Sequence, residues 1–381
     1  MVPSRTDVLI VGAGPVGLAT AARLATLGVQ VTVLDKQAVG ANTSRAAVVH
    51  PRTLEALDEI GVTERLSALA IRSTEFTIRD RDRVLVPLRF DRMPSRYRHM
   101  LMVPQSTTER VLLDRLIELG GSVLRPHTVT ALEQDGDGVT VTLDGGERIR
   151  AGYVVGADGM HSAVRELAGI GFGADHGGES FTLADIRIDG GLPAAEVILY
   201  FSTSGMLVAA PLPDGSFRIV AGVDDAPEQP SAGYVEELLR ARGPARVPVT
   251  VKEVVWGSRF RVHHRVAESF RAGRVLLAGD AAHVHSPAGG QGMNLGLRDA
   301  IALGTALGSV LHGGPESELD GYAGTQRPIA KEVVRFAGLL TRLATVGPRV
   351  RPLRNLMLRT LARIPAFRFT LAKRLSGLAD R

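Results

Sequence analysis

The hydrophobic pattern of the first 35 residues predicts a strand, a helix and a second strand. Residues 7–12 (DVLIVG) form a continuous apolar run that ends in glycine, which is typical of a buried parallel strand. A helical pattern follows at about 15–27, and a second apolar run (VQVTVLD) ends at Asp35. This order indicates a βαβ unit, in which a helix joins two parallel strands.

Further along the chain, two insertions of alternating strands interrupt the series of buried parallel strands. Buried-strand runs recur at 153–158 and 274–280, and alternating segments lie at 74–79, at 83–90 and between about 177 and 262. Helices are predicted over residues 51–60, 104–119 and 231–242, and a three-stranded meander over 121–150. We therefore predict an α/β fold: a Rossmann-like domain of the glutathione-reductase type, an inserted and mainly antiparallel β-sheet domain, and a helical C-terminal tail.

Both domains are predicted to be discontinuous. The nucleotide-binding domain takes residues 1–71, 101–176 and 263–330, and the inserted domain, expected to bind the substrate, takes 72–100 and 177–262. Residues 331–381 form the tail. They hold 12 of the 45 basic residues of the chain but only two of its 40 acidic residues. We expect the tail to pack as amphipathic helices on the chain's own acidic body. The leucines at helical spacing are Leu339, Leu340, Leu343, Leu353, Leu356 and Leu361.

The composition excludes several kinds of chemistry. The chain has no cysteine, so disulfides, thiolate catalysis, iron–sulfur clusters, zinc–thiolate sites and flavin attachment through sulfur are all excluded. No metal site is predicted, because His283 and His285 have no cluster of carboxylates beside them in the sequence. The N-terminus shows no signal peptide and no apolar run is long enough to span a membrane, so we expect a cytoplasmic protein.

A glycine motif lies between the first strand and the first helix. In Gly12-Ala13-Gly14-Pro15-Val16-Gly17, Gly12 permits a tight turn, Gly14 lets the backbone approach a pyrophosphate, and Gly17 lets helix and strand pack closely. The N-terminus of the helix faces the phosphates. Asp35, at the end of the next strand, is placed to accept hydrogen bonds from a ribose and argues against a 2′-phosphate there. The motif in this setting predicts a dinucleotide site.

Two later motifs indicate which dinucleotide it is. Residues 154–165 read VVGADGMHSAVR, and residues 274–300 read RVLLAGDAAHVHSPAGGQGMNLGLRDA. Together with the glycine motif, they resemble the flavoprotein aromatic hydroxylases of the para-hydroxybenzoate hydroxylase type, the class A monooxygenases. The resemblance runs through most of residues 5–305 and looks strongest to the actinomycete polyketide hydroxylases. Many members of that branch continue into a thioredoxin-like domain, whereas a tail of about 50 residues, 12 of them basic, follows here.

The resemblance implies non-covalently bound FAD and assigns roles to the motif residues. Asp158-Gly159 would lie near the FAD pyrophosphate and the groove where NADPH or NADH docks, and Asp280 would hold the ribityl chain. Asp280 follows an apolar strand, so we expect it to be buried. The loop from Pro287 to Gly290 would lie against the flavin ring, with Pro287, Gly289 and Gly290 acting through their backbone in catalysis. The residues assigned to the cofactor are Gly12, Gly14, Pro15, Gly17, Asp35, Lys36, Arg45, Gln105, Asp158, Gly159, Asp280, Pro287, Gly290, Gly292, Met293 and Asn294.

The implied reaction is hydroxylation of an aromatic or polyketide-like small molecule by NAD(P)H and O₂ through a flavin C4a-hydroperoxide. The alternatives are a flavin-dependent reductase or dehydrogenase of the same fold, or a flavin-binding protein without turnover. A halogenase is disfavoured, because the chain has a single tryptophan, Trp256, and halogenases carry a Trp-x-Trp-x-Ile-Pro segment. No nucleic-acid partner is expected and membrane contact is not favoured. The protein is expected to be a monomer or a homodimer.

Overall fold

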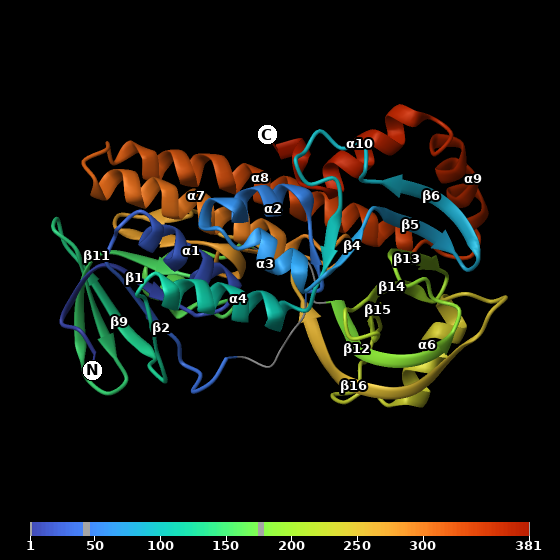
Figure 1. Cartoon of the computed structure of the whole chain (residues 1–381), viewed down its shortest axis with the longest axis horizontal. Coiled ribbons are helices and arrows are strands. Elements are labelled where there is room, and N and C mark those ends of the chain that lie inside the picture. The colour runs from blue at the N-terminus through green and yellow to red at the C-terminus, as the bar shows by residue number, and fades with distance from the viewer. Residues whose placement is uncertain (1, 41–45, 174–178, 381) are drawn as a thin grey trace.

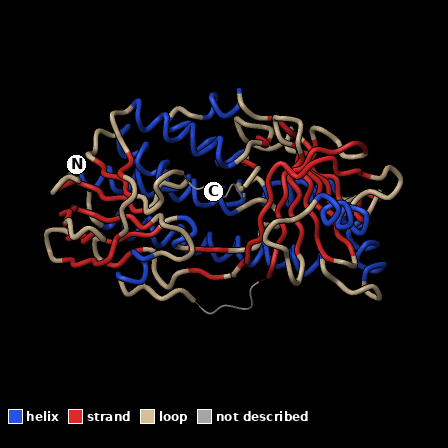
Figure 2. Tube along the Cα trace, turned by 90° about the horizontal axis from the view of Figure 1, so that it is seen from below, coloured by secondary structure: helices blue, strands red, loops and turns tan. Residues whose placement is uncertain are grey.

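Strands gather toward the two ends of the molecule, and helices run along the space between them. The computed structural model describes residues 2–40, 46–173 and 179–380 (Figure 1). Figure 2, seen from below, shows the two groups of strands well separated. No helix in these three described ranges has the length and apolarity needed to cross a bilayer.

The first sheet is the parallel sheet that the apolar runs predict. Its order is β18-β19-β11-β1-β2-β8, and β19, β11, β1, β2 and β8 run parallel. The strands are β1 (Arg5–Val11), β2 (Val31–Leu34), β8 (Val123–Leu124), β11 (Arg148–Gly156), β18 (Arg271–Ala272) and β19 (Val275–Leu277). The sheet is buried on both faces, which explains why β1 reads as a continuous apolar run.

The three-stranded meander is present but differs from the prediction in one respect. It consists of β9 (Val129–Gln134), β10 (Val139–Leu143) and the first half of β11. The last meander strand and the strand predicted at 153–158 are therefore one strand. It begins beside β10 and ends between β1 and β19.

Three long helices pack beside the first sheet. They are α1 (Pro15–Thr26), which joins β1 to β2, α4 (Gln105–Glu118) and α7 (Gly292–Leu311). α1 packs against both α4 and α7. Smaller elements complete this end: α2 (Pro51–Leu57), α3 (Thr63–Ala68), α5 (Ala163–Leu167), and the short strands β3 (Val48–Val49), β4 (Ile71–Ser73), β7 (Met100–Met102), β17 (Arg265–Val266) and β20 (His283–Val284).

The second sheet is mainly antiparallel, as predicted, and combines segments from both insertions. Its order is β16-β12-β15-β14-β13-β5-β6, and only β13 and β5 are parallel among these described strands. The strands are β5 (Glu75–Asp80), β6 (Arg83–Arg89), β12 (Glu179–Gly190), β13 (Glu196–Ser202), β14 (Gly205–Pro211), β15 (Phe217–Gly222) and β16 (Val249–Val262). α6 (Ala232–Arg242) covers one face, with Val235 and Leu239 in a core of its own.

The tail is helical and packs on the second sheet. α8 (Ser317–Ala344) runs along the top of the molecule in Figure 1, followed by α9 (Arg351–Leu361) and α10 (Pro365–Leu375), which contact β6. Leu340, Leu358 and Leu375 are buried in the core of the second sheet. Not every leucine of the helical pattern lies on the packed face, since Leu339, Leu353 and Leu356 are exposed.

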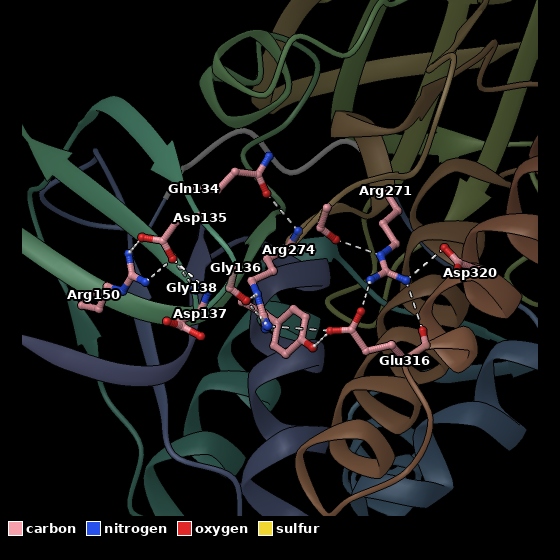
Figure 3. Close-up of polar contacts among 12 residues, drawn as sticks. Gln134, Asp135, Gly136, Asp137, Gly138, Arg150, Arg271, Arg274, Glu316 and Asp320 are labelled. Atoms are coloured by element: carbon pink, nitrogen blue, oxygen red, sulfur yellow. Dashed lines mark hydrogen bonds and ion pairs between the residues drawn. The ribbon is translucent and has the colours of Figure 1, made fainter.

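A polar network closes the amino edge of the first sheet, opposite the edge where its motifs lie (Figure 3). Arg271 pairs with Glu316 and Asp320, and the backbone N–H of Arg274 donates to the side-chain oxygen of Gln134. Arg271 belongs to β18 and Arg274 precedes β19, whereas Asp280 follows β19. The network therefore connects the meander and α8 to the sheet, and it lies at the edge opposite the motifs.

A second ion pair is buried where the two halves of the molecule meet. Arg218 of β15 makes a bidentate contact with Asp185 of β12, at 2.7 Å for each pair of atoms. Its third nitrogen donates to the carbonyl oxygen of Ala46 at 2.7 Å, and its side chain is 2% exposed. Ala46 belongs to the segment that leads into β3, so this guanidinium connects the second sheet to the first domain.

We predict that these two ion-pair systems contribute very differently to stability. Replacing Asp185 with alanine leaves a buried guanidinium without its carboxylate, which costs about 3–5 kcal/mol. Replacing Asp320, which is mostly exposed in its pair with Arg271, costs less than about 1 kcal/mol. Urea unfolding of the two variants measures both values, and equal losses would contradict this assignment.

Candidate functional site

The predicted motifs meet at one edge of the first sheet. Gly12 follows β1, Asp35 follows β2, Asp158 lies just beyond β11, and Asp280 follows β19. These four strands are parallel, so all four motif positions lie at their carboxyl ends. Ligands of open α/β sheets bind in the crevice outside this edge. The first helix and α7 both begin here.

The glycine turn fits a pyrophosphate in three ways. Gly12 has a φ of +103°, and a methyl group at this position would lie 2.3 Å from the carbonyl oxygen of Ala157. A methyl group at Gly17 would lie 1.9 Å from the carbonyl oxygen of Gly12, so helix and turn are in direct backbone contact. Around Gly14, by contrast, the space is open to at least 4 Å. Pro15 begins α1, whose first turn has no acid to compete with a bound anion.

Asp35 lies beside an arginine that the sequence analysis missed. Its carboxylate accepts the N–H groups of Ala13 and Gln37, each at 2.8 Å, and lies 3.8 Å from the guanidinium of Arg125. One terminal nitrogen of Arg125 is buried and has no hydrogen-bond partner among the described residues. Arg125 directly follows β8, the parallel neighbour of β2, and this position was the available signal. Lys36 is exposed at the same edge.

Gln105 supports this region from the start of α4. It accepts the N–H of Ala46 at 3.2 Å and donates to Glu109 at 2.9 Å. Burial raises the pKa of Glu109, although the hydrogen bond from Gln105 opposes that shift. Arg45, which was assigned to the cofactor, lies outside the described residues.

Asp158 is held by its own loop. It accepts the hydroxyl of Ser162 at 2.5 Å and the N–H of Val164 at 3.2 Å, and Ser162 is the N-cap residue of α5. Burial raises the pKa of Asp158. Gly159 next to it has open space where a side chain would stand. Gly159 therefore leaves room for a ligand, and Asp158 fixes the loop that carries this glycine.

Asp280 is exposed, which contradicts the expectation of a buried acid. It lies in the short 3-10 turn Gly279–Ala281 after β19, where the strand ends and the chain faces outward. An exposed carboxylate at this edge is suited to hydroxyl groups of a ligand. The buried acid is instead Asp299 of α7, which the sequence analysis did not select. It accepts the N–H of Gly279 at 3.2 Å and contacts Nε2 of His283 at 2.5 Å.

The loop proposed to face the flavin ring is fixed by buried polar side chains. The N–H of Gly290 donates to the carbonyl oxygen of Pro287 at 2.9 Å, and Gly289 and Gly290 have φ values of +86° and +65°. The side-chain amide of Asn294 donates to the carbonyl oxygens of Val48 and Gly290, at 2.8 and 2.7 Å. Its oxygen accepts the N–H of His50 at 2.7 Å. Asn294 thus positions the loop with all of its side-chain groups.

His50 adds a further hydrogen bond to this loop. Its Nε2–H donates to the carbonyl oxygen of Gly289 at 2.9 Å. Burial lowers the pKa of His50 to about 4, so the ring is neutral at pH 7. Its Nδ1 is buried without a hydrogen-bond partner among the described residues. His50 is a member of the site that was not predicted from the sequence.

The N-terminus of α7 opens beside this loop. The N–H of Leu295 donates to the carbonyl oxygen of Gln291 and begins the hydrogen-bond ladder of α7. The N–H groups of Gly292, Met293 and Asn294 come before it and therefore lie at the helix terminus. No acid lies in the first turn, and no side chain occupies the space next to Gly292. This terminus can stabilise negative charge on a ligand.

The second sheet lies over the same loop. Ala288 of the loop and Ala47 pack in one buried cluster with Phe181, Met206 and other residues of the second sheet. Trp256 of β16 packs against this cluster and lies 5.9 Å from the guanidinium of Arg218. The described residues contain no group of three or more His, Cys, Asp or Glu side chains that could hold a metal ion.

This geometry is that of a known family. Residues 5–337 match the family described as FAD binding domain. The chain belongs to this family. The 12-dehydrotetracycline 5-monooxygenase/anhydrotetracycline 6-monooxygenase of Streptomyces rimosus subsp. rimosus is 39% identical over 394 residues, which cover 99% of this chain and 77% of that protein.

Solved structures of the FAD-binding family agree with the fold. The OxyS anhydrotetracycline hydroxylase from Streptomyces rimosus superposes with a TM-score of 0.83 at 38% identity, over 98% of this chain and 76% of that one. The p-nitrophenol 4-monooxygenase from Pseudomonas putida DLL-E4 gives a TM-score of 0.87 at 27% identity, over 99% and 98%. The predicted fold, the cofactor FAD and the flavin-dependent monooxygenase class are confirmed.

Gly14 provides a direct test of the pyrophosphate position. Because the space beside it is open, we predict that Gly14→Val folds normally but blocks the ligand. The dissociation constant of FAD should rise by at least about 100-fold, the equivalent of one or two lost charge-assisted hydrogen bonds. Gly321→Val in α8, which also meets open space, is the matched control. Fluorescence titration of apoprotein with FAD measures both variants, and unchanged binding by Gly14→Val would contradict the assignment.

The buried histidines predict a loss of stability in acid. Burial lowers the pKa values of His50 and His285 to about 4, and Arg298 near His50 and His283 and His264 near His285 act in the same direction. Unfolded histidine takes up a proton near pH 6.5, so the unfolded state gains protons first as the pH falls from 6.5 to 4. Between pH 7 and pH 5 the free energy of unfolding should fall by about 2 kcal/mol for each histidine. In His50→Gln this pH dependence should be smaller by one such step, and a slope equal to that of the wild type would contradict the prediction.

Proposed function

We propose that the chain hydroxylates a polycyclic aromatic substrate of the polyketide type, which binds between the loop Pro287–Gly290 and the second sheet. The observation that carries this proposal is that Ala288 of the loop belongs to the same buried apolar cluster as Phe181 and Met206 of the second sheet, and that α7 begins just after the loop, at Gly292. A planar substrate held there would present one face to the ring loop and the other to the sheet. The relatives named for tetracycline intermediates support the substrate class.

The residues that would hold FAD follow from the edge of the first sheet. Gly12, Gly14 and Gly17 with the start of α1 would take the pyrophosphate, and Asp35 the ribose of the adenosine. The exposed Asp280 would take the ribityl hydroxyls. The loop Pro287–Gly290 and the N–H groups of Gly292 and Met293 would take the flavin ring. We propose that the site also includes Lys36, Arg45, Gln105, Asp158 and Asn294. Of these, Gln105, Asp158 and Asn294 would act by positioning the backbone.

When bound, FAD supplies the redox chemistry: it accepts a hydride from NAD(P)H and activates O₂ for the transfer of one oxygen atom. The protein contributes orientation and charge. Asn294 and His50 hold the carbonyl groups of Gly290 and Gly289 in place. The N-terminus of α7 would stabilise negative charge on the bound cofactor, and the apolar cluster around Ala288 and Met102 would exclude water from it.

Two further parts of the proposal concern the setting of the enzyme. We infer that it acts in the cytoplasm, where NADPH and NADH are available, and that it works as a monomer or a homodimer.

The proposal is tested with labelled oxygen. We expect the purified holoenzyme, given NADPH or NADH and anhydrotetracycline or p-nitrophenol under ¹⁸O₂, to form a product that carries one ¹⁸O atom, with the second atom leaving as water. The tetracycline-type substrate should accelerate NAD(P)H oxidation more than p-nitrophenol does. Mass spectrometry of the product reads the label. Substrate-dependent NAD(P)H consumption without ¹⁸O in any organic product would instead identify a reductase.

A further inference from the structure

The hairpin formed by α9 and α10 exposes an unusual concentration of apolar side chains. Six of the 14 exposed large apolar side chains in the described part of the chain lie within residues 350–369. They are Val350, Leu353, Leu356, Met357, Ile364 and Phe369, and we call them the outer face of the hairpin. Leu353 and Leu356 are 68% and 61% exposed. The hairpin lies at the upper right edge of the molecule in Figure 1.

This exposure does not come from poor docking of the hairpin. On the opposite side of α9, Arg354 and Leu358 are buried, and Arg354 donates to the carbonyl oxygen of Leu343 at 2.9 Å. Arg351 forms an ion pair with Asp80 of β5. α9 thus has one face fixed on the second sheet and another apolar face directed outward, although a helix at a protein surface ordinarily has a polar outer face.

The tail itself contributes only positive charge around the outer face. No acid occurs between Glu332 and Asp380. Within the described residues, Arg351 and Arg374 are the tail cations that pair with acids, namely Asp80 and Glu332. Arg349, Arg359 and Arg363 are exposed and flank the apolar side chains. The chain's own body therefore neutralises little of the tail, contrary to the expectation from the sequence.

A second copy of the chain is a poor partner for this surface. A symmetric dimer would place the same face of both copies together, and the unpaired arginines would repel each other with no acid between them. An anionic lipid surface fits both features. Its head groups attract exposed arginines, and Leu, Ile, Met and Phe side chains insert at the boundary between head groups and acyl chains.

We infer that the outer face of the α9–α10 hairpin binds the surface of an anionic membrane. The hairpin would lie at the boundary between the lipid head groups and the acyl chains, while its buried face remains packed on the second sheet. No segment would cross the bilayer. This inference goes beyond the oxygenase activity and does not depend on it.

Vesicle sedimentation of the holoenzyme tests the inference. We expect partition onto vesicles of phosphatidylcholine with about one third phosphatidylglycerol to be at least about tenfold stronger than onto pure phosphatidylcholine, since each basic residue near the surface contributes about a fivefold factor. The partition should weaken as salt is added. Leu353→Ser with Leu356→Ser, and separately Arg359→Gln with Arg363→Gln, should each lower it by about tenfold or more. Ile117→Ser on α4, which also removes an exposed apolar side chain, is the matched control and should bind like the wild type.

Turnover of a water-soluble substrate separates this test from the proposed function. The four substituted positions lie on the outer face or its rim, so both double variants should keep wild-type turnover. Equal partition onto neutral and anionic vesicles, or no partition at all, would overturn the inference. Light scattering that shows a dimer in the wild type and a monomer in Leu353→Ser with Leu356→Ser would also overturn it, because a second copy would then cover this face.

Discussion

The close backbone packing at the carboxyl edge of the first sheet is the constraint on which the site depends. Gly17 lies so near the carbonyl of Gly12, and Gly12 so near that of Ala157, that no side chain fits between α1, the first turn and β11. This packing brings the start of α1 and the loop at Asp158 together. It leaves Gly14 open to the outside. The open space beside Gly14 is therefore the position that we propose for the pyrophosphate.

The second constraint is a set of buried polar groups that hold the loop Pro287–Gly290 and the turn Gly279–Ala281 in place. Asn294 uses its whole side chain on the backbone of Val48, Gly290 and His50, and the neutral His50 binds Gly289. Asp299 and His283, both fully buried, hold Gly279 and so the turn that contains Asp280. These groups hold the backbone that we propose to contact the cofactor. Removing any one of them changes the position of a loop as well as a hydrogen bond.

The sequence predicted what depends on local pattern and failed where distant segments meet. The βαβ start, the parallel and antiparallel sheets and the glycine turn follow from runs of apolar residues and turn chemistry. Arg125 was missed, because it reaches Asp35 only through the pairing of β8 with β2, two strands that are distant in the sequence. Asp280 was placed in the core because it follows an apolar strand, whereas the chain turns outward there. The tail leucines share a helical pattern, but the pattern does not reveal which face meets the second sheet.

A crystal structure of the FAD-loaded enzyme is the most direct test of the proposed cofactor site. We expect one FAD per chain, with its pyrophosphate at Gly14 and the N-terminus of α1. The ribityl chain should lie at Asp280, and the flavin ring should lie against the loop Pro287–Gly290 with its edge at the N-terminus of α7. A flavin ring found away from that loop, or a pyrophosphate away from Gly14, would contradict the proposed site.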